Sequence, residues 1–254
     1  MLTFQPELPA HFSTEADTPS FAVPGVVSAV GYRSVEGVYR GLPSSRLTLI
    51  VSLDDGLQVN DMPSEPRPIP VVLAGLQLQA SRVRKGRGQG VVQLAVHPLA
   101  ARALFGVPAA ELNAASLDAA AVLGRPVSRL HEQVTEAKNW PLAFARVARY
   151  LQGARRAAPV RPEVAYAWKL LAHSHGQIPV RVVAGQVGIS PRHLTTLFHR
   201  EVGHTPKTVA MLMRFEFGMS FPEIAAELGQ SADGVRMKLN RALKQMALLL
   251  DGDE

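Results

Sequence analysis

The sequence predicts an α+β protein in which a β-rich N-terminal domain is followed by an all-helical C-terminal domain. Two patterns and the chain length lead to this prediction. From 26 to 96 the apolar residues alternate in short β-branched runs bounded by glycine and proline, as in strands. After His97 the apolar residues recur every three or four positions, as in amphipathic helices. A chain of 254 residues is long enough for two domains.

The composition indicates a globular protein, since 47% of the residues are hydrophobic and only 19% are charged. The formal net charge of +6 suits nucleic acid or an acidic surface as a partner, although many basic proteins bind neither. Because the chain has no cysteine, disulfides and thiolate metal sites are excluded. The first residues lack the pattern of a secretory signal, and no apolar run approaches the ~20 residues of a membrane span. We therefore expect a cytoplasmic protein without membrane contact.

The strands are expected in the first part of the N-terminal domain, after a proline-rich and irregular lead-in over residues 1–25. Alternating or β-branched runs predict four of them, at 25–33, 46–53, 71–79 and 90–96. Asp54, Asp55 and Gly56 predict a turn after the second run. The prolines between 63 and 70 predict a loop before the third.

A helical segment from Val127 to Gln152 ends this domain. Pro141 lies inside the segment and predicts a break, so we expect a pair of helices. Residues 153–162 are small, basic and proline-containing, which predicts a linker. The expected organisation is therefore a domain at 1–152, a linker at 153–162 and a helical domain at 163–254.

The helical domain begins with a pattern typical of a helix-turn-helix at about 180–203, two short helices joined by a tight corner. Gly188 supplies the corner, where a side chain would be unfavourable. Ser190 can cap the second helix and Pro191 suits its first position, while Gly203 can end it. The second helix is expected at 191–202. Its apolar residues share one side: Leu194, Leu197, Phe198 and Val202.

The opposite side of this second helix carries polar side chains that can all donate hydrogen bonds: Arg192, His193, Thr195, Thr196, His199 and Arg200. No carboxylate interrupts them before Glu201. Because a helix fits the major groove of DNA, such a surface is suited to a polyanion, and we expect double-stranded DNA as the partner. The alternative interpretation is that these cations are only the solvated side of an amphipathic helix.

A second unit of the same kind is predicted at about 220–246. Ser220 and Glu223 form a capping box, Gly229 supplies the corner, and a helix is expected at 231–246. Two groups of side chains on this helix are candidates for DNA contact. The candidates for bases are Ser231, Asp233, Arg236 and Lys238, and those for the phosphate backbone are Arg241 and Lys244.

Other polar clusters do not predict catalysis, a metal or a cofactor. The glycine-rich stretch 86–90 lacks the Gly-Lys-Thr/Ser ending of a phosphate-binding loop and precedes a strand rather than a helix. The adjacent Asp54 and Asp55 form a turn, whereas paired catalytic carboxylates converge from separate elements. His173 and His175 are two residues apart and would point about 200° apart on a helix. We expect no catalytic residue, no metal site and no cofactor.

The run 162–215 closely resembles the first half of an AraC-type DNA-binding domain. The resemblance depends on Trp168, on the Ser-Pro-Arg-His-Leu sequence at 190–194 and on the Glu-Val-Gly-His-Thr-Pro-Lys sequence at 201–207. The segment Tyr39–Val51 is more loosely similar to regulatory domains that precede such domains.

The resemblance implies a transcriptional regulator whose recognition helices, 191–202 and 231–246, enter successive major grooves. Positions that match the motif assign base contacts to Arg192, Thr195 and Thr196. They assign phosphate contacts to His199, Arg200 and Lys207. The N-terminal domain is then expected to sense an effector or to dimerise.

The last segment departs from that family. Phe217–Lys244 looks more like the promoter-reading helix-turn-helix of an extracytoplasmic-function sigma factor, and the connecting helix is roughly ten residues short. The alternative function is therefore a sigma-like or RNA polymerase-binding transcription factor. An enzyme within 26–155 is a weaker alternative, because no nucleophile, base and orienting group can be connected there. Beyond DNA, the partners left open are RNA polymerase, a small-molecule effector and a second copy of the chain.

Overall fold

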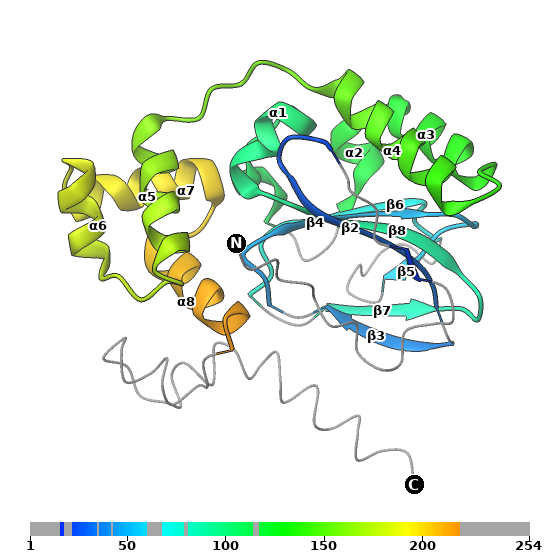
Figure 1. The fold of residues 1–254 in the computed structure, drawn as a ribbon, viewed down its shortest axis with the longest axis horizontal. Coiled ribbons are helices and arrows are strands. Elements are labelled where there is room, and N and C mark those ends of the chain that lie inside the picture. Colours follow the sequence, from blue (N-terminus) through cyan, green and yellow to red (C-terminus); the bar gives the residue numbers. More distant parts are fainter. Residues whose placement is uncertain are drawn as a thin grey trace, which may run out of the picture.

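The computed structural model describes residues 16–17, 22–34, 36–41, 43–59, 68–78, 81–113 and 117–218. Strands dominate its N-terminal part, and helices make up its C-terminal part (Figure 1). This order confirms the predicted α+β class. A two-residue strand within the lead-in, β1 (Ala16–Asp17), was not predicted.

The strands form two antiparallel sheets. The larger has the order β1, β2 (Val26–Arg33), β8 (Gly90–Val96), β4 (Leu47–Ser52), β6 (Val71–Ala74), β9 (Leu117–Asp118). The smaller has the order β3 (Gly37–Gly41), β7 (Ser81–Lys85), β5 (Gln58–Val59). In the larger sheet Leu49 of β4 is paired with Leu94 on one side and with Leu73 on the other.

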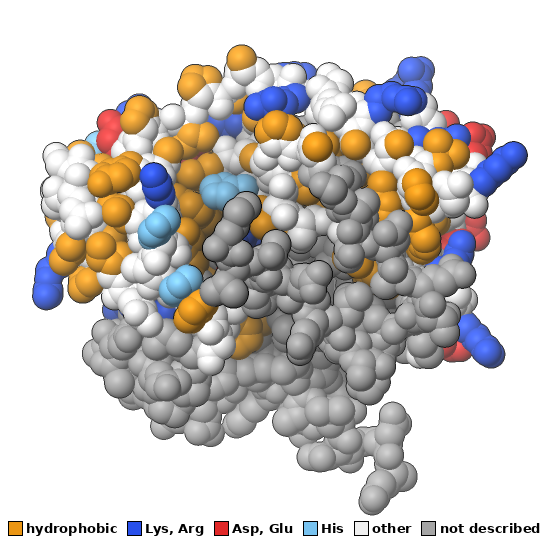
Figure 2. Space-filling model, in the orientation of Figure 1, with side chains coloured by type: hydrophobic (Ala, Val, Ile, Leu, Met, Phe, Trp, Pro, Cys, Tyr) orange, Lys and Arg blue, Asp and Glu red, His pale blue; other side chains and the backbone are white. Residues whose placement is uncertain are grey.

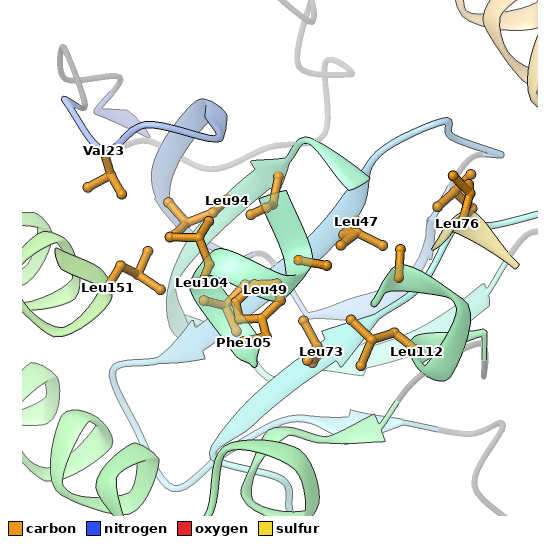
Figure 3. Packing of buried hydrophobic residues seen from close by; sticks show 14 of the residues in the cluster. Val23, Leu47, Leu49, Leu73, Leu76, Leu94, Leu104, Phe105, Leu112 and Leu151 are labelled. Atoms are coloured by element: carbon orange, nitrogen blue, oxygen red, sulfur yellow. The ribbon is translucent and has the colours of Figure 1, made fainter. Parts of the chain in front are cut away.

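The central strands of the larger sheet, β4, β6 and β8, are buried on both faces. Their successive side chains point to opposite sides of the sheet, and nearly all of them are buried. Leu47, Leu49 and Val51 belong to the main hydrophobic core, which also contains Leu104 and Phe105 of the following helix (Figure 3). Four residues of the opposite face form a smaller cluster with Leu57 and Ile69: Tyr32, Ile50, Val72 and Val91. Burial on both sides explains why these strands read as nearly continuous apolar runs.

Short helices connect the sheets to the helical pair: η1 (Pro98–Ala100), α1 (Ala101–Phe105), η2 (Ala109–Leu112) and α2 (Ala119–Leu123). The pair consists of α3 (Arg125–Thr135) and α4 (Trp140–Ala154). The chain breaks before Pro141 rather than at it. Pro141 lies in the first turn of α4, where its missing N–H is not needed, and Asn139 caps the helix by accepting from Leu142 N at 3.0 Å.

Four helices follow residues 155–161, which contain no helix or strand. They are α5 (Pro162–His173), α6 (Val180–Val187), α7 (Pro191–Val202) and α8 (Pro206–Glu216). Helices α5, α6 and α7 pack on one another, and α8 packs on α5 and α7. The predicted second unit at 220–246 lies outside the described residues. Among the residues that are described, no helix is long and apolar enough to cross a membrane.

The helices and the large sheet share one continuous hydrophobic core. It extends from Leu49 and Leu94 in the sheet to Trp168 in α5 and Phe198 in α7. His97, at the end of β8, packs on Trp168 with ring centroids 5.1 Å apart. The helical part is therefore held against the β-rich part in a defined orientation.

Candidate nucleic-acid interface

The corner between α6 and α7 is formed by a glycine in the left-handed region. Gly188 has φ +81° and follows the last turn of α6. The N–H of Ile189 donates to the carbonyl of Ala184 at 3.1 Å, which closes the end of the helix. A residue with a Cβ would be strained at this φ, so the glycine allows the tight turn that the sequence predicted.

Helix α7 has the bounds that its local signals predict. The Oγ of Ser190 accepts a hydrogen bond from the N–H of His193 at 3.1 Å, and Pro191 is the first helical residue. At the other end Gly203 has φ +82° and donates to the carbonyls of His199 and Phe198. A capped start and a glycine stop fix the length of α7.

The inner side of α7 holds the helix in place. Its four apolar residues are buried: Leu194, Leu197, Phe198 and Val202. Phe198 stacks on Trp168 of α5, with ring centroids 6.4 Å apart and planes at 15°. Burying each such side chain contributes about 1.5–3 kcal/mol, so rotating α7 about its axis would be costly. The outer side of the helix is therefore fixed outward.

The outer side carries the predicted contact residues, of which Arg192, His193, Thr196, His199 and Arg200 are exposed and Thr195 is half-buried. Arg192, Thr196 and Arg200 follow one another at intervals of four and lie within about 80° of arc. They form a central stripe with His193 and His199 beside it. Thr195 lies nearer the buried side, next to Phe198 and Val202, which explains its partial burial.

The two threonines differ from the sequence-based expectation in one respect. Thr195 Oγ1 donates to the carbonyl of Pro191 at 2.9 Å, and Thr196 Oγ1 donates to the carbonyl of Arg192 at 3.1 Å. Both hydroxyl protons are therefore used within the helix. What each threonine presents in this rotamer is its methyl group and the free lone pairs of its oxygen.

The carboxylate that follows the cationic stripe is paired away from it. Glu201 accepts from Arg102 of α1, with Nε–Oε2 at 2.9 Å and Nη2–Oε1 at 3.3 Å. The hydrogen bond from Arg102 to Glu201 raises the pKa of Arg102, so the guanidinium stays charged. Because its charge is neutralised by a partner in the β-rich part, Glu201 does not oppose an anion on the outer side of α7.

Two further cations lie in the first turns of neighbouring helices. Lys207 is exposed at the second position of α8, as the resemblance suggested for a phosphate contact. Arg181 is exposed at the corresponding position of α6 and was overlooked in the sequence. A cation is unfavourable at a helix N-terminus unless an anion binds there, and this is the signal that would have found Arg181.

Histidine side chains group over the helical part in Figure 2, where few acidic side chains appear. His175 has φ +50° and stacks on Phe217, with ring centroids 3.6 Å apart. His204 is mostly buried between α7 and α8. Burial lowers the pKa of His204, the nearby His199 lowers it further, and a hydrogen bond with the backbone of Leu76 opposes both effects.

His97 and Asp54 have structural partners. His97 is the cap of η1 and accepts from Leu99 N at 3.2 Å; burial and, to a lesser degree, Arg46 lower its pKa to about 4. Asp54 accepts from Gly90 N at 2.6 Å. Within the described ranges, no three of His, Asp and Glu are grouped so that they could hold a metal ion. The second set of predicted contacts falls outside those ranges: Ser231, Asp233, Arg236, Lys238, Arg241 and Lys244.

A comparison with known protein families finds a match for one segment of the chain. Residues 209–246 match the family model for sigma-70, region 4. This confirms the predicted resemblance of the last segment to a sigma factor helix-turn-helix. The match covers a small part of the chain, and it begins inside α8. No curated protein matches the sequence.

Two solved structures are similar to this chain at low levels. The AraC-like transcriptional activator CuxR is 14% identical, with 87% of this chain and 84% of that chain covered and a TM-score of 0.32. ToxT from Vibrio cholerae O395, bound to (E)-4-(8-methylnaphthalen-1-yl)but-3-enoic acid, is 12% identical, with 72% and 97% covered and a TM-score of 0.22. At these scores the two likenesses carry no argument about function. CuxR is described as AraC-like, the type that residues 162–215 resemble.

Proposed function

We propose that this chain is a sequence-specific, DNA-binding regulator of transcription whose helix α7 enters the major groove. The observation that carries the proposal is the exposed stripe of Arg192, Thr196 and Arg200 on a helix whose other side is buried. The neighbouring Glu201 is neutralised by Arg102. A capped, outward-fixed and cationic helix has the form that major-groove recognition requires.

The residues of α7 divide into two roles in this proposal. Arg192, in the first turn, is placed to pair with a guanine through both of its terminal nitrogens. Thr196 presents its methyl group to a thymine, with Thr195 and His193 at the edges of the same contact. Four side chains bind phosphates and set the position of the helix without reading sequence: Arg181, His199, Arg200 and Lys207.

A second reading helix at 231–246 is supported by the match to sigma-70, region 4. We assign base contacts there to Ser231, Asp233, Arg236 and Lys238, and phosphate contacts to Arg241 and Lys244. In the same proposal residues 1–152 form a regulatory domain that senses a small molecule or dimerises. Residues 153–162 join it to the DNA-binding domain at 163–254.

Selection from a pool of randomised duplexes tests the function directly. The full chain should enrich a defined site. Binding to that site should weaken with salt, because each phosphate contact releases counterions, and a scrambled duplex should bind at least about a thousandfold less tightly. No enrichment, or equal affinity for selected and scrambled duplexes, would contradict sequence-specific binding.

The sigma-70, region 4 match also favours a second function, an RNA polymerase-binding transcription factor. The two functions differ in what the chain binds first. Co-purification with RNA polymerase in the absence of promoter DNA would support the second. Selection of a duplex by the chain alone would support the first.

A further inference from the structure

The β-rich part holds the C-terminal end of α8 through one carboxylate. Glu216 Oε1 accepts from Ser44 Oγ and from the backbone N–H of Ser45, both at 2.8 Å. Its Oε2 accepts from Ser45 Oγ at 2.6 Å. Three donors on one carboxylate, from a segment more than 170 residues earlier, make a directed, charge-assisted contact. We call these three hydrogen bonds the Glu216 latch.

The N-terminal end of α8 contacts the same region of the β-rich part. His204, two residues before α8 begins, lies near the backbone of Leu76, which opposes the lowering of the His204 pKa by burial. Leu76 is adjacent to Gln77, and Gln77 pairs with Ser44 through backbone hydrogen bonds of 3.0 and 3.3 Å. Residues 44–45 and 76–77 therefore form one platform, which contacts residues at both ends of α8.

This platform is continuous with the large sheet. Residues 44–45 lead into β4, and residues 76–77 follow β6, which is paired with β4. A rearrangement of these two strands would therefore be transmitted to Glu216. The central residues of α8 are buried, from Val209 to Arg214. The middle of the helix is therefore packed in the interior, and Glu216 fixes its C-terminal end to the platform.

Docking on the β-rich part leaves the outer side of α7 free. Besides the latch, two polar contacts engage the C-terminal end of α7: Arg102 with Glu201, and Asn113 Nδ2 with the carbonyl of Gly203 at 3.2 Å. A Cβ at Gly203 would collide with the Asn113 side chain, so the glycine allows this approach. Since the stripe of α7 is exposed, docking fixes the orientation of the helical part and does not cover it.

We propose that Glu216 is a positioning residue, which fixes the connecting helix α8 on the β-rich part and so sets the separation of the two reading units on DNA. The inference rests on the proposed function. The position of Glu216 in the sequence also supports the inference. Glu216 is the last residue of α8, and the match to sigma-70, region 4 extends beyond it to residue 246. A carboxylate is unfavourable at a helix C-terminus, so without the serine donors Glu216 would weaken α8.

The first test of the Glu216 latch measures the distance between two spin labels, one on α3 and one on α5, in the absence of DNA. Because the chain has no cysteine, spin labels can be placed at Arg129→Cys on α3 and Lys169→Cys on α5, both exposed. The full chain should give a narrow distance distribution. Glu216→Ala and the double variant Ser44→Ala/Ser45→Ala should broaden it, whereas Glu132→Ala, an exposed carboxylate on α3, should not. An unchanged distribution in both latch variants would overturn the proposal.

The consequence for DNA is tested with two duplexes. One duplex is the full selected site. The other is a half site, which keeps only the half of the selected site that the parent protects and the Arg192→Ala variant does not. Glu216→Ala should bind the full site about tenfold more weakly than the parent and the half site within about twofold of the parent. The reason is that only binding by both reading units at once depends on the distance between them. Equal losses on both duplexes would overturn the positioning role. A parent chain that binds no duplex would overturn the DNA-reading function, while the distance measurement would still decide whether the latch exists.

Discussion

Arg102 of α1 and Glu201 of α7 pair across the boundary between the β-rich and helical parts, with Nε and Oε2 2.9 Å apart. The two residues are 99 positions apart in sequence. The pair joins the parts, and it neutralises the carboxylate nearest to the cationic stripe. Without Arg102, Glu201 would leave an unpaired negative charge at the C-terminal end of α7.

Replacing Arg102 by alanine should therefore weaken DNA binding without touching the outer side of α7. The expected loss is about two- to fivefold on specific and scrambled duplexes alike, since an unpaired carboxylate acts through charge and is screened by salt. Fluorescence titration at two salt concentrations measures it. Arg102→Ala/Glu201→Gln should recover most of the loss; no recovery would show that Arg102 acts through domain docking instead.

Arg192→Ala should weaken binding to the selected site by about 1–3 kcal/mol and relax the preference at one base pair. The reason is that the guanidinium in the first turn of α7 reads a base edge. Lys169→Ala, an exposed cation on α5, is the matched control and should leave the preference unchanged. Equal losses on the selected and scrambled duplexes would assign Arg192 to a phosphate.

Thr196→Val should bind the selected site within about twofold of the parent. The hydroxyl proton of Thr196 is already donated to the carbonyl of Arg192, so valine keeps the methyl group that reaches the DNA. Thr196→Ala removes that methyl group and should cost about 0.8 kcal/mol at one base pair. Competition with duplexes changed at single positions compares the two variants. A valine variant weaker than the alanine variant would indicate that the hydroxyl donates to a base.

Lys207→Ala and Arg181→Ala should each weaken binding to selected and scrambled duplexes equally. Each cation lies in the first turn of a helix, where it can neutralise one phosphate. The slope of log K against log salt should therefore fall by about one in either variant. An unchanged slope in Arg181→Ala would remove this residue from the interface.

The sequence predicts the recognition helix well because the signals are local. Ser190 and Pro191 start α7, Gly203 ends it, and the apolar spacing identifies its buried side. Four strands of the large sheet, β2, β4, β6 and β8, were predicted for the same reason, from runs of adjacent residues, whereas the two-residue strands β1 and β9 were not. Pro141 misled the prediction only in detail, because a proline fits the first turn of a helix as well as a break.

The contacts between the two parts, and the rotamers on the outer side of α7, could not be predicted. Glu216 meets Ser44 across 172 positions, and nothing in either local pattern indicates the other. The bonds of the Thr195 and Thr196 hydroxyls to the backbone depend on rotamers, which residue spacing does not specify. Pairing of distant side chains and choice of rotamer are properties of the packed structure.

His97 should make folding stability depend on pH. Burial first, and Arg46 second, lower its pKa from 6.5 to about 4 in the folded chain. As pH falls below 6.5 the unfolded chain takes up a proton that the folded chain refuses until about pH 4, so protons favour unfolding. The contribution of His97 to the free energy of unfolding is up to about 3 kcal/mol. It is complete above pH 6.5 and is lost as the pH falls from 6.5 to 4.

Urea unfolding at pH 7.5 and pH 5 measures this difference. His97→Asn is the matched variant, because its side-chain oxygen can still accept from Leu99 N and cap η1 but does not titrate. The variant should lose less stability than the parent between the two pH values. An equal loss in both chains would show that His97 is not the group responsible for the pH dependence.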